Sequence, residues 1–378
     1  MKIKIKKIFK IFFCMIKYQF FVMYCKFFKI DNGHVWLISE RGNDARDNSY
    51  HLYKYIKKNH PEICVKYIID KKSADRKKID SEDIVNYCSN LHYILFITSG
   101  RLISTHIMGF SPDMSLFWRL NKIGLLRVKG KKIMLQHGIT QNYLEFMNKK
   151  TSKLDLFICG AKPEYKFILD NFGYNKKVVK YTGFARFDNL KNEFKNQILI
   201  MPTFRKWLNY SDNFIDSNYY KKWNELLNNK ELINYLEKNN INLYFYPHYE
   251  IQKNINDFKS ISKNIIIADF KNYDVQKLLI DSKLLITDYS SVFFDFAYMN
   301  KPVIYYQFDL YEFRKKHYKE GYFDYETMGF GPVCKSSRDV VLNIINYKFD
   351  YKERVQKFFE YNDKSNCERI YNEILKIK

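Results

Sequence analysis

Short apolar runs alternate with polar and helical stretches along most of the chain. The runs that predict strands lie at 34–38, 63–69, 101–105, 132–136, 155–159, 178–181, 197–201, 242–246, 265–268, 283–286 and 303–306. Helical periodicity follows several of them, as at 50–58, 162–171, 219–238 and 274–281. Apolar strands that alternate with helices are typical of α/β domains with parallel sheets. The pattern therefore predicts an α/β fold with two doubly wound domains.

The alternation pauses halfway, at the polar and charged stretch 191–196. A chain of 378 residues can hold two domains of ordinary size. We therefore expect a separate amino-terminal segment over 1–30, a first α/β domain over 31–190 and a second over 191–378. The tail 351–378 is amphipathic and helical, and a return of this tail to the first domain is an open alternative.

Residues 1–30 combine many aromatic side chains with repeated lysines. The longest window without lysine, 18–25, is too short for a spanning helix, and no small-residue cleavage site follows it. Four lysines would share one face of a helix: Lys2, Lys6, Lys10 and Lys17. Such a segment is expected to lie in the interface of an anionic membrane. The alternative is a basic amphipathic helix that packs on its own protein.

The charge of the chain indicates an anionic partner. Lys and Arg number 64 against 41 Asp and Glu, a formal net charge of +23. Membrane lipid, nucleic acid and a phosphate-rich substrate all fit this charge. No RNP, zinc-finger or helix-turn-helix signature is present, which argues against nucleic acid. The seven cysteines form no C-x-x-C pair, as expected for reduced thiols in a cytosolic protein.

The sequence Thr287-Asp288-Tyr289-Ser290-Ser291 joins an apolar run to a helical stretch. A helix that begins there would point free backbone N–H groups outward and favour anions, above all phosphate. The hydroxyls of Thr287, Ser290 and Ser291 would add donors. The alternative is that Asp288 and Ser290 only cap a helix.

Polar residues also follow three other predicted strands. His137 ends the strand 132–136 and could accept a proton from an attacking hydroxyl, or could instead be a satisfied core histidine. Arg205 follows the strand 197–201 and could bind phosphate in a bidentate way, or form a surface ion pair. His248 follows the strand 242–246 and could bind a pyrophosphate, or be structural. In open α/β sheets ligands bind at the carboxyl ends of strands.

The run TDYSSVFFDFAYMNKPVIYYQFD, followed by GYFDYE at 321–326 and Gly331-Pro332, resembles the signature of the CDP-glycerol glycerophosphotransferase family. This family contains teichoic-acid and capsule polymerases and primases. The resemblance implies a GT-B arrangement, in which two Rossmann-like domains face each other across a cleft. It also implies a catalytic base and a donor site, comprising His137 for the base and Thr203, Arg205, His248, Thr287, Asp288, Ser290, Ser291 and Asp295 for the donor.

Further parts of the chain are similar to the family, and two depart from it. Asp47 and Asn48 match a D-N-x-x-x-x-Y patch, for which we expect a structural or acceptor-side role. After its His-Gly the family often has Thr-Pro-Leu-Lys, whereas this chain has Ile139-Thr140-Gln141-Asn142. The family often has a lysine before its Pro-His, where this chain has Tyr246. Asp295 would either accept ribose hydroxyl bonds or stabilise the first turn of its helix.

The resemblance implies transfer of glycerol phosphate, or a related polyol phosphate, from CDP-glycerol or CDP-ribitol. The acceptor would be a hydroxyl of a lipid-linked glycan or polyol phosphate, and CMP would leave. The chain has no D-x-D motif, so nothing in it requires a metal, and we expect no cofactor. The enzyme would be peripheral, on the cytoplasmic face of the membrane. Two alternatives remain: a GT-B glycosyltransferase that uses a nucleotide sugar, and a non-catalytic basic protein that binds membrane or RNA.

Overall fold

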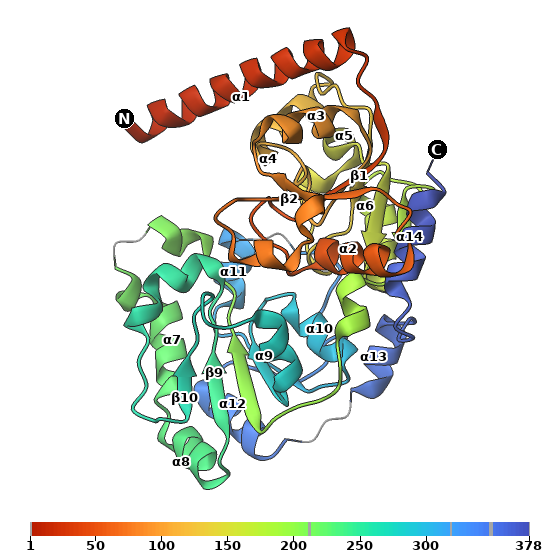
Figure 1. The fold of residues 1–378 in the computed structure, drawn as a ribbon. Coiled ribbons are helices and arrows are strands. Elements are labelled where there is room, and N and C mark those ends of the chain that lie inside the picture. Colours follow the sequence, from red (N-terminus) through yellow and green to blue (C-terminus); the bar gives the residue numbers. More distant parts are fainter. Residues whose placement is uncertain (1, 211–212, 318–319, 348–350, 378) are drawn as a thin grey trace. The chain divides into compact units, whose positions relative to one another are not determined.

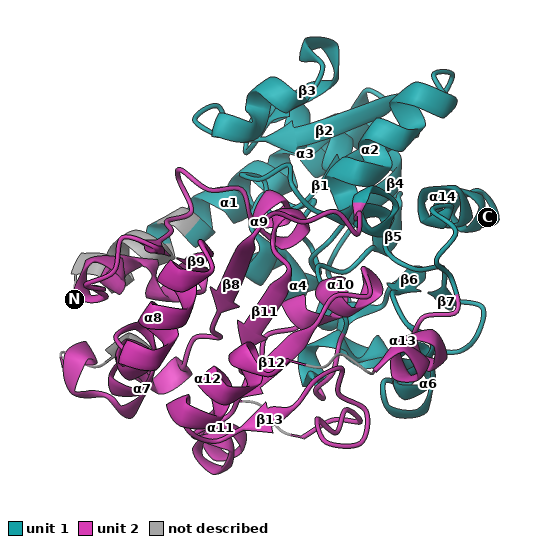
Figure 2. Ribbon diagram, turned by 90° about the horizontal axis from the view of Figure 1, so that it is seen from below, with its two compact units in different colours: residues 1–139, 144–189, 361–378 teal, residues 140–143, 190–360 magenta. Residues whose placement is uncertain are grey.

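The computed structural model describes residues 2–210, 213–317, 320–347 and 351–377, without the side chains of 2–8, 10, 209 and 210. The chain divides into two compact units, coloured separately in Figure 2. Unit 1 comprises residues 1–139, 144–189 and 361–378, and unit 2 comprises 140–143 and 190–360. The units part next to the expected boundary at 190. The amino-terminal segment belongs to unit 1, however, and so does the tail from 361 onward, which takes the alternative left open above.

Unit 1 is built on a sheet of seven parallel strands. Their order across the sheet is β3-β2-β1-β4-β5-β6-β7. The strands are β1 (Asn32–Ser39), β2 (Val65–Ile69), β3 (Ile84–Asn86), β4 (Ser99–Ser104), β5 (Lys131–Met134), β6 (Leu156–Cys159) and β7 (Val179–Tyr181). Trp36 in β1 lies opposite Val65 in β2 and Arg101 in β4, which fixes the register of the three central strands.

Helices cover both faces of this sheet. They are α1 (Lys2–Phe27), α2 (Asn48–Asn59), α3 (Asn90–Thr98), α4 (Met114–Lys122), α5 (Lys149–Ser152), α6 (Lys162–Asn171) and α14 (Asn366–Leu375). Successive strand side chains point to opposite faces. Val35 and Leu37 join a core with residues of α1, α3 and α4, whereas Trp36 meets Tyr371 of α14 with 5.7 Å between ring centroids. Both faces are therefore buried, as the apolar runs predict.

Unit 2 repeats the plan with six parallel strands in the order β10-β9-β8-β11-β12-β13. The strands are β8 (Gln197–Met201), β9 (Asn242–Phe245), β10 (Ile265–Ile267), β11 (Leu284–Thr287), β12 (Val303–Tyr306) and β13 (Val333–Cys334). Counted from the first strand of each unit, both sheets begin 3-2-1-4-5-6, the Rossmann order. The predicted class, parallel α/β with two Rossmann-like sheets, is confirmed.

The helices of unit 2, labelled in Figure 1, are seven to ten residues long. They are α7 (Asn218–Leu227), α8 (Lys230–Lys238), α9 (Val275–Asp281), α10 (Val292–Tyr298), α11 (Leu310–Lys316), α12 (Ser337–Ile345) and α13 (Lys352–Phe358). The single helix predicted over 219–238 is wrong, because α7 ends at Leu227 and Asn229 caps a new helix. The Asn229 side chain accepts a hydrogen bond from the backbone of Leu232, a typical helix start.

The order of strands marks one position in each sheet. The chain moves outward from β1 on one side and from β4 on the other, so β1 and β4 border the switch point of unit 1. In unit 2 the same position lies between β8 and β11. Ligands of such sheets bind beyond the carboxyl ends of the strands at this point. The residues that follow β1, β4, β8 and β11 are therefore the first to consider for function.

Helix α1 is packed along one part and open along another. Tyr18, Phe21 and Cys25 are buried in the core of unit 1, and the Tyr18 hydroxyl donates to the carbonyl of Arg127 at 3.0 Å. This part matches the alternative in which the helix packs on its own protein. Other rings of the helix stay exposed, namely those of Phe9, Phe12, Phe13, Phe20 and Phe27. The side chains of Lys2, Lys6 and Lys10 lie outside the described residues. Within the described part of the chain, no helix has both the length and the apolar character needed to cross a bilayer.

Candidate functional site

Three strand ends of unit 1 bring polar side chains to one edge of the sheet. Glu40 follows β1, Thr105 and His106 follow β4, and His137 follows β5 shortly after its last residue. Because β1, β4 and β5 are neighbours and parallel, their carboxyl ends meet at the same edge. These residues therefore form one cluster beside the switch point of unit 1.

The His137 ring is held on one side and open on the other. A ring N–H donates to the backbone carbonyl of Thr105, and the ring stacks on that of His106 at 4.4 Å between centroids and 8° between planes. The side chain nevertheless keeps solvent exposure. Crowding by protein atoms, with the cations of Arg186 and Arg41, lowers the pKa of His137 to about 4. At pH 7 the ring is neutral, and the nitrogen that does not donate to Thr105 has a free lone pair.

His92 shows what a purely structural histidine looks like in the same unit. Its side chain is fully buried, and burial lowers the pKa of His92 to about 4 as well. Its Nδ1 accepts from the backbone N–H of Cys88 at 3.0 Å, and its Nε2 donates to the carbonyl of Phe110 at 2.9 Å. Both nitrogens are therefore occupied. A low pKa does not separate the two histidines, whereas the lone pair of His137 does.

Two carboxyl groups and an arginine complete the cluster. The Arg186 guanidinium pairs with Asp47 at 2.8 Å. Glu40 is buried, and its Oε1 accepts from the backbone N–H groups of Arg46 and Asp47 at 3.0 and 2.6 Å. Burial and the nearby Asp47 carboxylate raise the pKa of Glu40 to about 8. The edge therefore combines a neutral base, a cation and a carboxyl group that tends to keep its proton.

Several members of this cluster escaped the sequence analysis. Glu40, Thr105 and His106 were not singled out, although all three lie at the carboxyl ends of predicted strands, where ligands of parallel sheets bind. Asp188 stands two residues after Arg186, but its contacts stabilise the fold. Its carboxylate accepts from the backbone N–H groups of Asn366 and Cys367 at 2.9 and 2.8 Å, which caps α14.

In unit 2, Arg205 forms the centre of a buried ion cluster. Its side chain has no exposure to solvent. It pairs with Asp309 through Nε and Nη2 at 2.8 and 2.9 Å, and with Asp288 through Nη1 at 2.9 Å. Nη1 also donates to the carbonyl of Thr203 at 2.8 Å. Burial alone would lower the pKa of Arg205, but the two carboxylates raise it, so the guanidinium stays charged.

The polar groups of Asp288 and Thr287, which lie near Arg205, also form hydrogen bonds within the protein. Asp288 accepts from the backbone N–H groups of Thr203 and Tyr289 at 2.8 and 2.6 Å. The Thr287 hydroxyl donates to the carbonyl of Met201 at 2.6 Å. These bonds tie the carboxyl ends of β8 and β11 together. The structure thus brings Thr203, Arg205, Thr287 and Asp288 together beyond β8 and β11, but it buries them; Asp295 is likewise buried, in α10.

Three of the predicted donor residues are open to solvent in part: Ser290, Ser291 and His248. The two serines lie between β11 and α10, which begins at Val292. His248 stacks on Phe204 at 4.6 Å between centroids, and its Nδ1 accepts from the backbone N–H of Glu250 at 3.2 Å. Because Nδ1 accepts, the neutral ring carries its proton on Nε2, which is then a donor.

Three of the residues that depart from the family pattern, Thr140, Gln141 and Asn142, are part of unit 2. The Gln141 amide donates to the carbonyl of Tyr289 at 2.8 Å and accepts from the Tyr325 hydroxyl at 3.0 Å. Asn142 accepts from the Arg314 guanidinium at 2.6 Å. Gln141 therefore stabilises the loop that carries the two serines, whereas Asn142 is bonded to α11.

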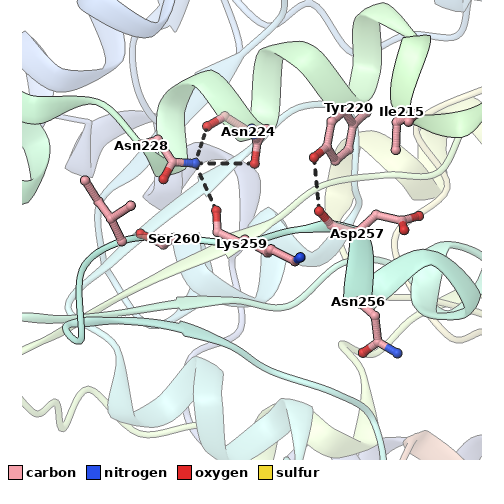
Figure 3. A pocket seen from close by; sticks show the side chains of 9 residues that line it. Ile215, Tyr220, Asn224, Asn228, Asn256, Asp257, Lys259 and Ser260 are labelled. Atoms are coloured by element: carbon pink, nitrogen blue, oxygen red, sulfur yellow. Dashed lines mark hydrogen bonds between the residues drawn. The ribbon is translucent and has the colours of Figure 1, made fainter.

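A cavity of about 650 Å³ lies elsewhere in unit 2, between α7 and residues 256–261 (Figure 3). Two hydrogen bonds cross its lining: the Asn228 amide donates to the carbonyl of Lys259, and the Tyr220 hydroxyl to that of Asp257. None of the candidate residues lines it. Among the described residues, no group of three or more His, Cys, Asp or Glu side chains is placed to hold a metal ion.

Comparison with known proteins finds relatives in sequence and solved structures with a similar fold. "Minor teichoic acid biosynthesis protein GgaB" of Bacillus subtilis is 38% identical over 369 residues, covering 91% of this chain and 40% of GgaB. "Teichoic acid poly(glycerol phosphate) polymerase" of Bacillus spizizenii is 26% identical over 350 residues, covering 85% of this chain and 86% of the polymerase. This chain therefore spans less than half of GgaB.

Among solved structures, the wall teichoic acid polymerase TagF matches with a TM-score of 0.72 at 18% identity, over 100% of this chain and 98% of the other. A putative UDP-N-acetylglucosamine 2-epimerase from Listeria monocytogenes matches with a TM-score of 0.54 at 12% identity, over 90% of this chain and 95% of the epimerase. At these identities the likeness concerns the fold alone. The sequence model of the CDP-Glycerol:Poly(glycerophosphate) glycerophosphotransferase family matches residues 18–376. The resemblance seen in the sequence is thus confirmed, and the chain belongs to the CDP-glycerol:poly(glycerophosphate) glycerophosphotransferase family.

Proposed function

We propose that this chain transfers glycerol phosphate from CDP-glycerol to a hydroxyl group of a lipid-linked acceptor in teichoic-acid-like or capsular polymer synthesis. The family match over 18–376 supports the reaction class. The observation that carries the mechanism is the His137 ring, which has one nitrogen fixed by Thr105 and a free lone pair on the other. A neutral, oriented imidazole is the group that a hydroxyl nucleophile needs.

The proposed reaction is a single displacement at phosphorus. The acceptor oxygen attacks the phosphorus that bears the glycerol, and His137 takes the proton of that hydroxyl. A new P–O bond forms, the P–O bond of the phosphoanhydride breaks, and CMP leaves with the bonding electrons. Such chemistry depends on positioning and on stabilising negative charge.

The pyrophosphate of the donor would be bound in unit 2 by its solvent-accessible groups. Ser290 and Ser291 offer hydroxyl donors, and His248 offers Nε2–H. Thr203, Arg205, Thr287, Asp288 and Asp295 would act indirectly, by holding the loops that present these donors. We favour this division because the Arg205 guanidinium is saturated by Asp288 and Asp309 and has no exposed surface.

Relatives of this chain use more than one polyol. They include a teichoic acid poly(ribitol-phosphate) polymerase, and one solved variant of TagF was soaked with CDPG. We propose glycerol as the polyol here because the matching family is defined by glycerophosphate. CDP-ribitol remains the first alternative donor to test.

The decisive experiment offers the purified chain three kinds of donor together with a membrane fraction. Release of CMP from CDP-glycerol supports the proposal, and release from CDP-ribitol alone would change the polyol. Release of a nucleoside diphosphate from a nucleotide sugar would instead favour a glycosyltransferase. No release from any donor would favour a non-catalytic binding protein. His137→Ala is the control that ties release to this site.

We also propose that α1 attaches the protein to the cytoplasmic face of the membrane. The support is its exposed rings, of which those of Phe9, Phe13 and Phe27 are 67%, 73% and 80% exposed, in a chain of net charge +23. Vesicles with and without anionic lipid test this in a sedimentation assay. Binding should need anionic lipid and should fall when Phe12, Phe13 and Phe20 are changed to serine. Equal sedimentation of the serine variant would refute the attachment.

A further inference from the structure

The backbone just before His137 adopts a conformation that it would not hold unaided. Gln136 has φ of +58°, in the left-handed region, although it is not glycine. Side chains with a Cβ avoid this region, and where they enter it the surroundings must impose it. The turn matters because it decides where the next residue, His137, directs its ring.

The side chain of Asn48 imposes this turn from one side. Its Nδ2 donates to the carbonyl of Gln136 at 2.7 Å and lies 3.4 Å from that of Leu135. Its Oδ1 accepts from the backbone N–H of Arg186 at 3.0 Å. Asn48 is fully buried and is the first residue of α2, so a rigid element carries it. One amide thus joins the turn before the base to the segment that carries Arg186.

The side chain of Gln136 anchors the turn from the other side. Its Nε2 donates to the carbonyl of Ile158 at 3.0 Å and to Oε1 of Glu164 at 2.9 Å. The other carboxylate oxygen of Glu164 accepts from the backbone N–H of Gly160 at 2.7 Å. Both Gln136 and Glu164 are buried. The peptide before His137 is therefore fixed by bonds to two neighbouring elements.

From this geometry we propose that Asn48 is a positioning residue for His137. It holds the left-handed turn at Gln136 so that the imidazole meets the Thr105 carbonyl with one nitrogen and the acceptor hydroxyl with the other. Asn48 does not touch substrate in this proposal. The expected change in kcat rests on the proposed function. The effect of Asn48 on the His137 ring, in contrast, can be measured without turnover.

The first variant is Asn48→Ala, matched by Asn59→Ala at the other end of α2, where the asparagine is exposed and bonds only within its helix. Loss of the clamp should lower kcat about 100-fold with little change in KM for the donor, as expected when a reacting group is misplaced by about 1 Å. Asn59→Ala should leave both constants unchanged. Thermal melting of both variants shows whether the fold persists. Wild-type kcat in Asn48→Ala would overturn the proposal.

The second measurement is independent of activity. Diethyl pyrocarbonate modifies neutral imidazole, so the extent of His137 labelling against pH, read by mass spectrometry, reports the state of the ring. The labelling midpoint of Asn48→Ala should move up from that of the wild type toward 6.5, the ordinary value, while Asn59→Ala should not move. If the wild type releases no CMP, the proposed function fails, and an unchanged midpoint would still overturn the clamp.

If Asn48→Ala does not fold, Asn48→Asp replaces it. Aspartate has the same shape and keeps the acceptor for the Arg186 N–H, but it loses the donor to the carbonyl of Gln136. It should therefore show the same loss of kcat. Full activity of Asn48→Asp would refute the role assigned to Nδ2.

Discussion

The two switch points of this protein carry opposite kinds of polar cluster. In unit 1 the His137 ring keeps a free lone pair and solvent exposure, and its neighbours hold it without using up its chemistry. In unit 2 the Arg205 guanidinium spends its donors on Asp288, Asp309 and a backbone carbonyl, and it is completely buried. The carboxyl edge of one sheet therefore carries an imidazole with unused hydrogen-bonding capacity, and that of the other a guanidinium whose bonds are taken up by the protein.

The comparison teaches that the type of a residue at a strand end does not decide its role. The two clusters differ in whether a hydrogen-bond donor or acceptor is left unused by contacts within the protein. A buried and fully paired charge contributes little to binding, because a ligand would have to displace its partners. An exposed group with one unused lone pair can accept a proton from a ligand without first losing a partner. Mutations in either cluster can test this difference.

The largest effect is expected from removal of the buried cation. Arg205→Ala leaves two carboxylates buried without their partner, which should lower the free energy of unfolding by about 3–5 kcal/mol. Urea unfolding would measure this change. Lys316→Ala, which breaks an exposed pair with Glu312, should cost less than about 1 kcal/mol. If the triple change Arg205→Met, Asp288→Asn and Asp309→Asn restores no stability, charge pairing is not the cause.

His137→Ala should have the reverse profile. Loss of a general base lowers kcat about 10²- to 10⁴-fold, whereas stability should hardly change because the ring is exposed. CMP release and thermal melting would be measured on the same preparation. His34→Ala, which removes another exposed histidine of unit 1, should keep full activity. Retention of activity by His137→Ala would remove the base from the mechanism.

The serines of unit 2 should show a smaller effect, confined to the donor. Ser290→Ala and Ser291→Ala each remove a hydroxyl proposed to bond a charged phosphate, which should raise KM for CDP-glycerol about tenfold. Steady-state kinetics with varied donor would show this. Ser260→Ala changes a serine of the cavity in Figure 3 and serves as the control. A change in kcat alone would contradict donor binding by the serines.

The smallest effect concerns pH. Because the pKa of His137 is lowered to about 4, the neutral base persists above that value, and activity should fall only as pH drops through it. The acidic limb of kcat/KM should therefore lie below 6.5. Arg41→Gln removes one cation that lowers this pKa and should shift the limb slightly upward. A limb at or above 6.5 in the wild type would contradict the assigned environment.

The sequence was sufficient for the sheets because buried parallel strands are continuous apolar runs. Two strands were not predicted: β13 has only two residues, and β3 offers a single apolar pair, Ile84-Val85, within a polar stretch. Lys162–Asn171 was predicted with its observed limits from its helical pattern. Helix and strand assignments thus depend on local signals that the chain supplies in most places.

The site was only partly predictable, because its decisive contacts join distant residues. Nothing near Arg205 in the sequence indicates that Asp309, 104 positions later, will pair with it. The partner of His137, the carbonyl of Thr105, is a backbone atom and has no sequence signal at all. Residue type and strand position could therefore propose where chemistry occurs, but only the bonded partners separate reactive groups from supporting ones.

The return of α14 to unit 1 affects how the protein is made. Unit 2 consists of the continuous segment 190–360 and of residues 140–143. Unit 1, in contrast, is incomplete until residues 361–378 have been made. During synthesis on the ribosome, Trp36 and the capping carboxylate of Asp188 stay uncovered until α14 emerges. Unit 1 is thus completed only after all of unit 2 has been made, and until then an apolar surface stays open to chaperones.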